Sequence, residues 1–520
     1  MKTSKLMIPL ALCAALCTPA FNAGAAKSFK RGVSESRLYL KEEIDVLMPG
    51  VSWTYNWANT PANSVADYMS AETMEFVPMC WNNRYDADAI REYCKAHPET
   101  KYLLGFNEPN FVRQANMSPE QAAEYWPDVK ALADELGLEL VGPAVNYSPD
   151  SGTHPDYEMY TWYRKFVDLV GLDAFDYIAL HCYSGGTSGM KEMIDNFYES
   201  YGKKIWLTEF SMGGDGGIKN ITPEGQIGSM VQQLEFLEKD DRVFRYSWFI
   251  AKNSPTASPC IGLIVPQNGE GERQLSEQGM VYVYMTDFDE TVYHGVDEIV
   301  PASEYINSTS LLLGSSHDSY NPGKLEITQF TSGAYADYQF DIPSAGEYTL
   351  TLRISGQGYD EGRFDPTVAV YSVDEDGEVL STLCEARQLT LSGNETVFAN
   401  ESFTINLQAG KQRIRIAEEG MPSGIHISCL TFGSAFTGVE SITMPGASDG
   451  MTCTVVADGT LYLQGAENAA TGYIYDLNGR MMSNSPVENN MMTIPNLDKG
   501  VYILKITTTD GKLKATKFIR

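Results

Sequence analysis

Tyr102-Leu-Leu-Gly-Phe-Asn-Glu-Pro-Asn110 is the stretch that decides the fold this sequence predicts. Its apolar start is typical of a buried strand, and the Gly-Phe-Asn-Glu-Pro segment that follows ends the strand abruptly. Asn107 and Glu108 therefore stand where a strand meets a loop. In a parallel α/β barrel, that end of the strands carries the chemistry.

A second strand of the same build follows later in the chain, Ile205-Trp-Leu-Thr-Glu-Phe210, with Glu209 near its end. Two carboxylates at the ends of short apolar strands predict the pair of a glycosidase, which a retaining enzyme holds about 5–5.5 Å apart. Proximity raises the pKa of one carboxyl group and keeps it protonated near neutral pH. We expect Glu108 to protonate the leaving oxygen and Glu209 to attack the anomeric carbon. The plainer alternative is two solvated loop residues, since most glutamates are exposed.

Short apolar strands alternate with helical patterns between about residues 40 and 290, which is typical of βαβ units around a parallel sheet. The sequence therefore predicts a (β/α)8 TIM-type barrel. An open doubly wound sheet is the alternative, but no glycine-rich phosphate loop follows the first strand. The expected strands are 50–55, 75–80, 102–105, 140–145, 177–182, 205–208 and 245–249, and the expected helices are 88–96, 119–136, 157–170, 190–201 and 223–239.

The order of these strands relates the two glutamates. The strand that ends at Glu209 is the third after the strand that ends at Glu108. Barrel glycosidases of the large retaining clan have the same offset, with the acid on strand four and the nucleophile on strand seven. If Glu108 ends strand four, an eighth strand must lie before residue 100, and the segment between Trp57 and Glu75 has room for it.

His181-Cys-Tyr183 ends another expected strand, between those of the two glutamates. Because side chains alternate along a strand, His181 and Tyr183 face the same side of the sheet. We expect Tyr183 to donate its hydroxyl to Glu209 and His181 to hold a sugar hydroxyl or orient the acid. Asn107, beside the acid, is expected to bind the sugar 2-hydroxyl. The alternative for His181 is a structural histidine with its hydrogen bonds satisfied inside the fold.

Tryptophans gather at the expected strand ends. Trp53, Trp57, Trp81 and Trp248 all lie at or just past such an end. Sugar rings present apolar C–H faces that stack on aromatic rings, so this row indicates a glycan cleft. Packing inside the fold is the alternative, and it is expected for the other three, Trp126, Trp162 and Trp206.

The composition excludes several other functions. The 520-residue chain has a formal net charge of −30, and an acidic surface is unsuited to nucleic acid or anionic membranes. The sequence has no His-x-x-x-His zinc pair, no nucleophile elbow around a serine and no phosphate-cradling loop. Among the chemistries considered, hydrolysis by a pair of carboxyl groups is the one that the sequence supports.

The first 25 residues are predicted to be a secretory signal, with Lys2 and Lys5 before an apolar core and Ala23-Gly-Ala25 as the cleavage site. A membrane anchor would need about 20 apolar residues, more than this run provides. Lipid attachment at Cys17 is disfavoured because the bulky Leu16 precedes it. No other stretch is long and apolar enough to span a bilayer.

Seven cysteines remain after the signal, an odd number without tight spacing, which predicts neither a disulfide scaffold nor a metal cluster. Most are expected to be small buried hydrophobic residues. A single bridge between Cys384 and Cys429 is left open. The seven are Cys80, Cys94, Cys182, Cys260, Cys384, Cys429 and Cys453.

From about residue 300 the period-two alternation of half-buried antiparallel strands replaces the helical pattern, which predicts a β-sandwich. A further all-β unit begins near Gly438 and holds Asn478-Gly479, a strong tight-hairpin signal. The expected domains are a signal at 1–25, the barrel at 26–295, the β-sandwich at 296–436 and a small immunoglobulin-like domain at 437–520. Clear sandwich strands are 334–340, 348–354, 367–373 and 412–417.

The barrel region resembles glycoside hydrolase family 128, retaining barrel enzymes that act on β-1,3-glucans. The resemblance covers about residues 45 to 285 and implies Glu108 as acid/base and Glu209 as nucleophile. It also implies glucan contacts by Trp53, Trp81, Asn107, His181, Tyr183 and Trp248. The matching stretches are Val51-Ser-Trp-Thr-Tyr-Asn-Trp57, Phe76-Val-Pro-Met-Cys-Trp81, Leu104-Gly-Phe-Asn-Glu-Pro-Asn110, His181-Cys-Tyr183, Trp206-Leu-Thr-Glu-Phe210 and Tyr246-Ser-Trp248.

Two further resemblances cover the rest of the chain. Residues 300–435 are similar to carbohydrate-binding β-sandwiches around family 6, which implies glycan binding and a structural calcium ion whose ligands the sequence does not place. This region has no tryptophan, so a spacer is the alternative role. Residues from about 440 onward resemble the carboxy-terminal sorting domains of type IX secretion, on Ile474-Tyr-Asp-Leu-Asn-Gly-Arg480 and the strands after it; a plain immunoglobulin-like domain is the alternative.

The sequence thus predicts a secreted or surface-held bacterial enzyme, an endo-β-1,3-glucanase that cleaves laminarin- or curdlan-type glucan with retention. We expect a monomer that needs no cofactor for catalysis and has β-glucan as its partner. The alternatives are a related retaining hydrolase acting on mixed-linkage glucan or mannan, and a catalytically silent surface protein that binds glycan.

Overall fold

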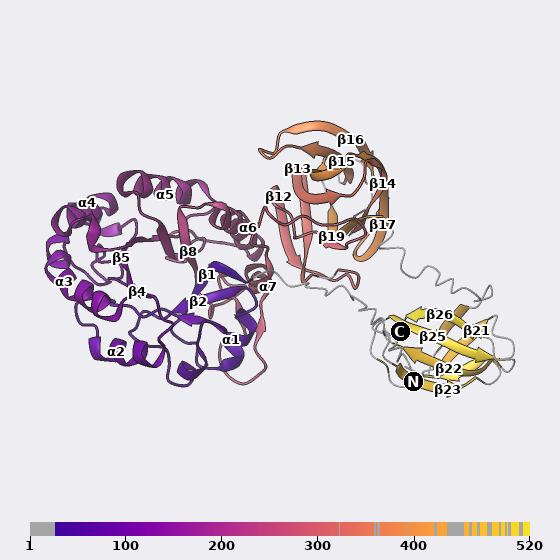
Figure 1. Ribbon diagram of the computed structural model, residues 1–520, viewed down its shortest axis with the longest axis horizontal. Helices are drawn as coiled ribbons and strands as arrows, with labels where there is room; N and C mark the ends of the chain where they lie inside the picture. The colour runs from indigo at the N-terminus through magenta and orange to yellow at the C-terminus, as the bar shows by residue number, and fades with distance from the viewer. Residues whose placement is uncertain are drawn as a thin grey trace, which may run out of the picture. The chain divides into compact units, whose positions relative to one another are not determined.

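The computed structural model describes residues 27–433, except 322, 358–359, 361–363, 392 and 421–423. Farther along it describes 452–456, 460–464, 469–475, 481–487, 490–494, 497, 501–508 and 513–519. The chain divides into two compact units, Met1–Gly433 and Ser434–Arg520 (Figure 1). The predicted signal at residues 1–25 and the Asn478-Gly479 turn lie outside the described residues.

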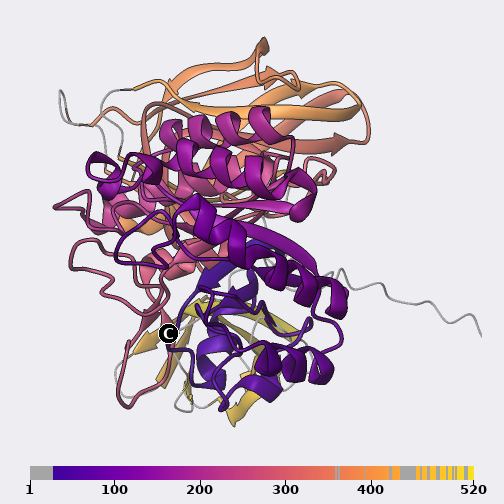
Figure 2. The same cartoon turned by 90° about the vertical axis from the view of Figure 1, so that its left-hand side faces the viewer.

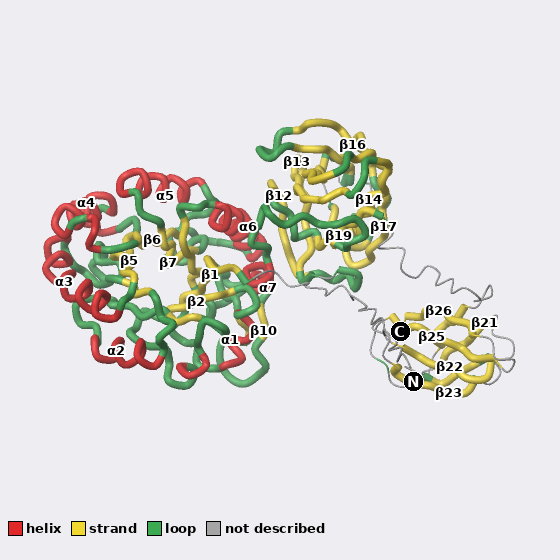
Figure 3. The backbone as a smooth tube through the Cα atoms, in the orientation of Figure 1, coloured by secondary structure: helices red, strands yellow, loops and turns green. Residues whose placement is uncertain are grey.

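Eight parallel strands curl into a closed barrel with helices around it (Figure 3). Neighbouring strands follow the order β3-β2-β1-β8-β7-β6-β5-β4, and a parallel bridge between Met79 and Leu104 joins the two ends. This confirms the predicted barrel. The strands are β1 (Ser28–Ser34), β2 (Val51–Tyr55), β3 (Glu75–Phe76), β4 (Tyr102–Leu104), β5 (Glu139–Val145), β6 (Tyr177–Cys182), β7 (Ile205–Phe210) and β8 (Val243–Phe249).

Two helices of the barrel begin directly after a cap residue followed by proline, the pairs Ser118-Pro119 and Thr222-Pro223. Ser118 accepts a hydrogen bond from the Gln121 N–H, and Thr222 accepts one from the Gly225 N–H, which satisfies backbone donors at each helix start. The purple helices of Figure 2 line one side of the barrel. The helices are α1 (Lys41–Leu47), α2 (Ala87–Ala96), α3 (Pro119–Leu136), α4 (Met159–Val170), α5 (Ser188–Tyr201), α6 (Pro223–Lys239) and α7 (Glu277–Tyr284), with short 3-10 turns η1 (Ala66–Tyr68), η2 (Pro149–Gly152), η3 (Pro155–Tyr157) and η4 (Leu172–Ala174).

The strand missing from the sequence prediction is β1. It lies before residue 100, as expected, but at Ser28–Ser34 and not between Trp57 and Glu75, where the structure has only the turn η1. Lys30 and Arg31 made this segment look polar. With β1 in place, Glu108 follows strand four and Glu209 lies on strand seven, which confirms the predicted numbering.

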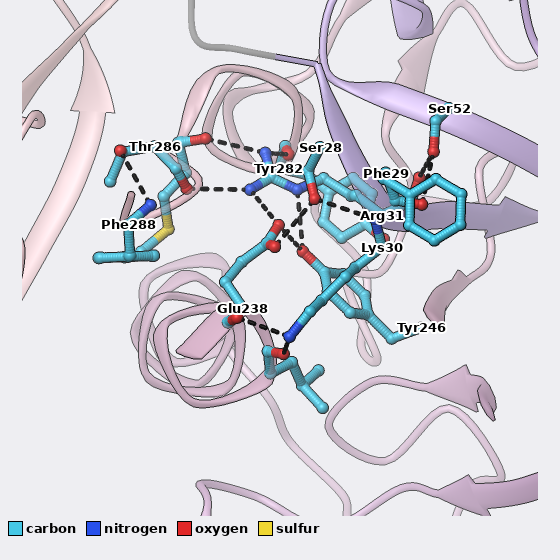
Figure 4. Close-up of polar contacts among 12 residues, drawn as sticks. Ser28, Phe29, Lys30, Arg31, Ser52, Glu238, Tyr246, Tyr282, Thr286 and Phe288 are labelled. Carbon is cyan, nitrogen blue, oxygen red and sulfur yellow. Dashed lines mark hydrogen bonds and ion pairs between the residues drawn. The ribbon is translucent and has the colours of Figure 1, made fainter. Parts of the chain in front are cut away.

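Arg31 is fully buried because every side of its guanidinium group has an acceptor (Figure 4). It forms an ion pair with Glu238 of α6 at 2.9 Å and donates to the Tyr246 hydroxyl of β8 at 3.0 Å. It also donates to the carbonyls of Tyr282, Met285 and Thr286 at 2.9–3.1 Å. A buried charge is tolerated only when it is paired and hydrogen-bonded in this way. The cluster ties β1 to β8, α6 and the end of α7.

The lower interior of the barrel, near the amino-terminal ends of the strands, is lined by aromatic side chains. Arg245 of β8 lies 4.8 Å from the ring of Tyr102 and 5.2 Å from that of Trp206, and it forms an ion pair with Glu75 at 2.7 Å. Trp53 packs edge-on against Trp206 with ring centroids 5.0 Å apart. Aromatic faces stabilise a desolvated guanidinium, so this layer fills the barrel without leaving the charge unpaired.

The remainder of the first unit is an antiparallel sheet in the order β16-β15-β18-β13-β19-β14-β17, with β11 and β12 at its margins. The four predicted sandwich strands fall within β13, β14, β15 and β18. Glu235 of α6 accepts hydrogen bonds from the backbone and hydroxyl of Ser308, joining the barrel to β12. The strands are β11 (Val300–Pro301), β12 (Asn307–Ser315), β13 (Leu325–Ile342), β14 (Gly346–Gly356), β15 (Thr367–Val373), β16 (Val379–Gln388), β17 (Asn394–Leu407), β18 (Gly410–Glu418) and β19 (Ile425–Phe432); β9 (Ile264–Val265) and β10 (Gln274–Leu275) form a small hairpin beside the barrel.

Two expectations from the sequence concern a disulfide bridge and a bound metal ion in this region. Cys384 and Cys429 are separate free thiols, so the bridge left open between them does not form. Within the part of the chain that the structure describes, no group of three or more His, Cys, Asp or Glu side chains is arranged to hold a metal ion. The calcium ion implied by the resemblance stays a prediction, because calcium is also held by backbone carbonyl and amide oxygens. No helix in the described part is long and apolar enough to cross a membrane.

The second unit is all-β, as predicted. Its strands form one sheet in the order β20-β21-β24 and another in the order β23-β22-β25-β26. Leu461, Ile474, Leu504 and Ile506 lie in its own hydrophobic core. The strands are β20 (Thr452–Val456), β21 (Thr460–Gln464), β22 (Ala469–Tyr475), β23 (Met481–Pro486), β24 (Met491–Thr493), β25 (Val501–Thr508) and β26 (Leu513–Ile519).

Candidate active site

Glu108 and Glu209 lie at the same end of the barrel. Glu108 comes four residues after the end of β4, and Glu209 is the fifth residue of β7. Their exposed fractions are only 6% and 5%. Glu108 has a φ of 42°, a left-handed backbone that is rare for a residue with a side chain. Strain of this kind persists only where the surroundings enforce it, and it concentrates at functional sites.

One imidazole ring lies between the two carboxyl groups. His181 Nδ1 is 2.9 Å from Glu108 Oε1, and His181 Nε2 is 3.4 Å from Glu209 Oε1. The ring is fully buried and stands beside Glu209 in the β6–β7 register. The structure thus places His181 against Glu108, as the sequence analysis allowed, and also against Glu209.

Glu209 accepts hydrogen bonds from three aromatic side chains. The Tyr183 hydroxyl donates to its Oε2, as the sequence predicted. The Tyr55 hydroxyl lies 3.1 Å from its Oε1, and the Trp57 indole N–H donates to the same oxygen at 2.8 Å. Donors that converge on one carboxylate favour its ionised form and fix its orientation. The arrangement is suited to a nucleophile.

Burial has the largest influence on the pKa of both central groups. It raises the pKa of Glu209; His181 lowers that pKa, Glu108 raises it, and hydrogen bonds from Tyr183 and Trp57 lower it, with a net result above the ordinary value. Burial lowers the pKa of His181, but attraction to Glu209 and Glu108 outweighs it and raises the pKa overall. The site therefore favours a protonated imidazole between two carboxyl groups.

Three asparagines surround the acid. Asn146, just past β5, donates to Glu108 Oε1 at 3.3 Å. Asn110 is fully buried and donates to the carbonyls of Asn146 and Tyr157, which anchors the loop after Glu108. Asn107 is 3% exposed, and its Oδ1 has no hydrogen-bond partner within the described residues. An unpaired buried acceptor is costly, so Asn107 is free to accept a substrate hydroxyl.

The four tryptophans expected at the mouth of the barrel differ in how deeply they are buried. Trp57 and Trp81 are partly exposed at the open end. Trp53 is fully buried in the lower interior, where its indole N–H donates to the Lys30 carbonyl. Trp248 is fully buried and packs against Phe210. The structure does not bring Trp53 or Trp248 to the mouth, because β2 carries Trp53 too low and β8 turns Trp248 away from the barrel axis.

Tyr55 and Asn146 contact the carboxylates but were not among the predicted site residues. Trp57 was expected at the mouth, but not as a hydrogen-bond partner of Glu209. Trp53 and Tyr55 alternate along β2 and face the barrel interior, and Trp57 continues the same spacing two residues past the end of that strand. That alternation was a usable signal for Tyr55 and Trp57. No comparable pattern marks Asn146.

Two family models match this chain. The family described as glycosyl hydrolase catalytic core matches residues 38–282, and the secretion system C-terminal sorting domain matches residues 457–520. An endo-β-1,3-glucanase of GH128 subgroup II from Pseudomonas viridiflava is 33% identical, over 49% of this chain and 97% of that one, with a TM-score of 0.43. The chain belongs to the GH128 glycosyl hydrolases.

Two further proteins are similar to this chain at lower identity. A subgroup I endo-β-1,3-glucanase from Amycolatopsis mediterranei, solved with laminaritriose, is 27% identical over 49% of this chain and 98% of that one, with a TM-score of 0.39. Alkali-sensitive linkage protein 1 of Schizosaccharomyces pombe is 26% identical over 239 residues, 45% of this chain. The chain spans 40% of the length of that curated relative.

Replacing His181 with Gln is expected to move the acidic limb of kcat/KM in this GH128 barrel to higher pH by about one unit. The reason is the sign of its charge: a protonated His181 lowers the pKa of Glu209, so its loss lets Glu108 and burial raise that pKa further. Glu209 must be ionised to attack, so activity then fails at a higher pH. The measurement is a pH–rate profile on laminarin.

His294→Gln is the matched control, because His294 lies in the following sheet region, where it contacts Glu298. Its profile is expected to overlay that of the wild type. An acidic limb that stays in place in His181→Gln would show that the imidazole does not act on Glu209.

Proposed function

We propose that this chain is a secreted endo-β-1,3-glucanase that cleaves its substrate with retention. The observation that carries the proposal is the single imidazole of His181, which contacts both Glu108 and Glu209. Such an arrangement holds two carboxyl groups around one bond of the substrate. It matches the two-carboxylate chemistry of glycoside hydrolysis.

The proposed reaction has two steps. Glu209 attacks the anomeric carbon and forms a glycosyl-enzyme bond while Glu108 gives its proton to the departing glycosidic oxygen. Glu108 then takes a proton from water, and the resulting hydroxide displaces Glu209 from the sugar. Tyr55, Trp57 and Tyr183 hold the attacking carboxylate in place throughout. Both the proton and the nucleophile come from carboxyl groups, so the reaction needs no cofactor.

The choice of β-1,3-glucan is supported by the GH128 relatives, whose names describe action on that polymer. Partly exposed Trp57 and Trp81 at the mouth offer faces for glucosyl rings. Asn107 Oδ1 offers an unpaired acceptor for the 2-hydroxyl. Export is supported by the sorting domain at residues 457–520 and by the predicted signal at residues 1–25.

Product analysis on laminarin, curdlan, mixed-linkage β-glucan and β-mannan tests the proposed function. We expect laminarin to yield a series of oligosaccharides early in the reaction, as endo cleavage requires, and mannan to remain intact. Proton NMR of the first product is expected to show the β anomer before mutarotation. Release of glucose alone would argue for exo cleavage, and an initial α anomer would exclude retention. Inactivity on all β-1,3-glucans would exclude the glucanase.

A further inference from the structure

Tyr147 is an exposed aromatic residue that follows a direct partner of Glu108. It is the second residue past the end of β5, and 53% of its surface is open to solvent. The residue before it, Asn146, is 5% exposed and donates to Glu108 Oε1. The proposed reaction steps give Tyr147 no role.

Hydrogen bonds hold Tyr147 at both ends. Its backbone N–H donates to Asn146 Oδ1 at 2.8 Å. Its hydroxyl lies 3.2 Å from the hydroxyl of Tyr160 in α4, with the two rings 6.3 Å apart at 76°. Asn196 of α5 donates to the Tyr160 hydroxyl at 3.3 Å. We name Tyr147, Tyr160 and Asn196 the Tyr147 shelf.

The shelf has the chemistry of a sugar subsite. An ordered ring face stacks on the C–H face of a pyranose, and fixing the ring beforehand lowers the entropy lost on binding. The two phenol hydroxyls and the Asn196 amide form one chain of hydrogen bonds, and their remaining donor and acceptor capacity can pair with sugar hydroxyls. Apolar faces edged by convergent polar groups are typical of carbohydrate sites.

The position of the Tyr147 shelf indicates on which side of the scissile bond its sugar would lie. Glu108 protonates the leaving oxygen, so the sugar that departs lies on the side of Glu108. Asn146 joins that carboxyl group directly to the residue before Tyr147. Trp57, by contrast, hydrogen-bonds to Glu209. The shelf therefore belongs with the leaving group and not with the sugar that becomes bound to the enzyme.

We propose that the Tyr147 shelf binds a glucosyl unit on the leaving-group side of the scissile bond. The inference rests on the proposed glucanase function and adds a subsite to it. It makes long oligosaccharides better substrates than glycosides that lack a sugar in this position. It also lets a second saccharide occupy the shelf and accept the glycosyl group in place of water.

The test compares two substrates in wild type, Tyr147→Ala and Tyr147→Phe. Laminarihexaose places sugars on both sides of the bond, whereas 4-nitrophenyl β-laminaribioside has a reactive aryl leaving group and no sugar there. For Tyr147→Ala we expect kcat/KM on laminarihexaose to fall about tenfold, the size of one lost aromatic contact, with little change on the aryl glycoside. Tyr147→Phe keeps the ring and is expected to retain most activity. Transfer to added laminaribiose should fall in Tyr147→Ala as well.

Leu169→Ala is the control. Leu169 is 55% exposed and lies nine residues beyond Tyr160 on α4, about 13 Å along the helix and away from the shelf. It is expected to behave as wild type on both substrates. Equal losses on the two substrates in Tyr147→Ala, or unchanged activity and transfer, would overturn the proposed subsite. Failure of the wild type on laminarihexaose would instead refute the glucanase function itself.

Discussion

Glu209→Gln is expected to lower the rate of laminarin hydrolysis on the order of 10⁴-fold or more. Glutamine keeps the shape of the side chain and can still contact Tyr183 and Trp57, but its amide does not form the glycosyl-enzyme bond. The loss should appear in kcat and kcat/KM alike, because the interaction exists only along the reaction path. Steady-state kinetics on laminarin measure it.

A smaller replacement identifies the role of Glu209 more directly. In Glu209→Ala, azide should enter the vacated space and attack the anomeric carbon of an activated β-laminaribioside, giving the α-glycosyl azide. Glu192→Gln, an exposed glutamate on α5, is the matched control and should keep wild-type rates. Substantial laminarin hydrolysis by purified Glu209→Gln would refute Glu209 as the nucleophile.

Glu108→Ala is expected to have the second-largest effect, a loss of about 10²–10⁴-fold on laminarin. The poor alkoxide leaving group of a glucan needs a proton, and Ala supplies none. A 2,4-dinitrophenyl glycoside leaves readily without protonation, so its first step should be nearly unaffected. The glycosyl-enzyme then accumulates, because no base activates water. The measurement is a pre-steady-state burst with this substrate.

Azide distinguishes the two glutamates by stereochemistry. In Glu108→Ala it should speed release of the glycosyl-enzyme and give the β-glycosyl azide, the opposite anomer from Glu209→Ala. If both variants gave the same anomer, the assignment of acid and nucleophile would fail.

Local patterns in the sequence located most of the barrel. Cap signals at Ser118 and Thr222 fixed the starts of α3 and α6, because a side-chain acceptor and a following proline act over only a few residues. β1 was not predicted, because the interactions that stabilise it come from residues far away in the sequence. Arg31 is polar in isolation, and only Glu238 and Tyr246, far away in sequence, make its burial favourable.

Some residues of the candidate site could also be predicted from local patterns, and others could not. Glu108 and Glu209 could be predicted because the ends of parallel strands share one edge of a barrel, whatever the details of packing. The pairing of Tyr183 with Glu209 followed from alternation along β6. The depth of Trp53 and the outward turn of Trp248 could not be predicted, because a strand end found by pattern is uncertain by a few residues.

Local patterns along the chain, from the Tyr102–Asn110 stretch outward, thus predicted a barrel glycosidase with Glu108 just past strand four. Tertiary structure alone decided that His181 would touch both carboxylates, that Tyr55 and Trp57 would hold Glu209, and that Tyr147, which follows a partner of Glu108, would stand exposed. The physical reason is the distance along the sequence over which each interaction acts. Strand periodicity and caps depend on neighbours in sequence, whereas a hydrogen bond such as Trp57 to Glu209 joins residues that only the closed barrel brings together.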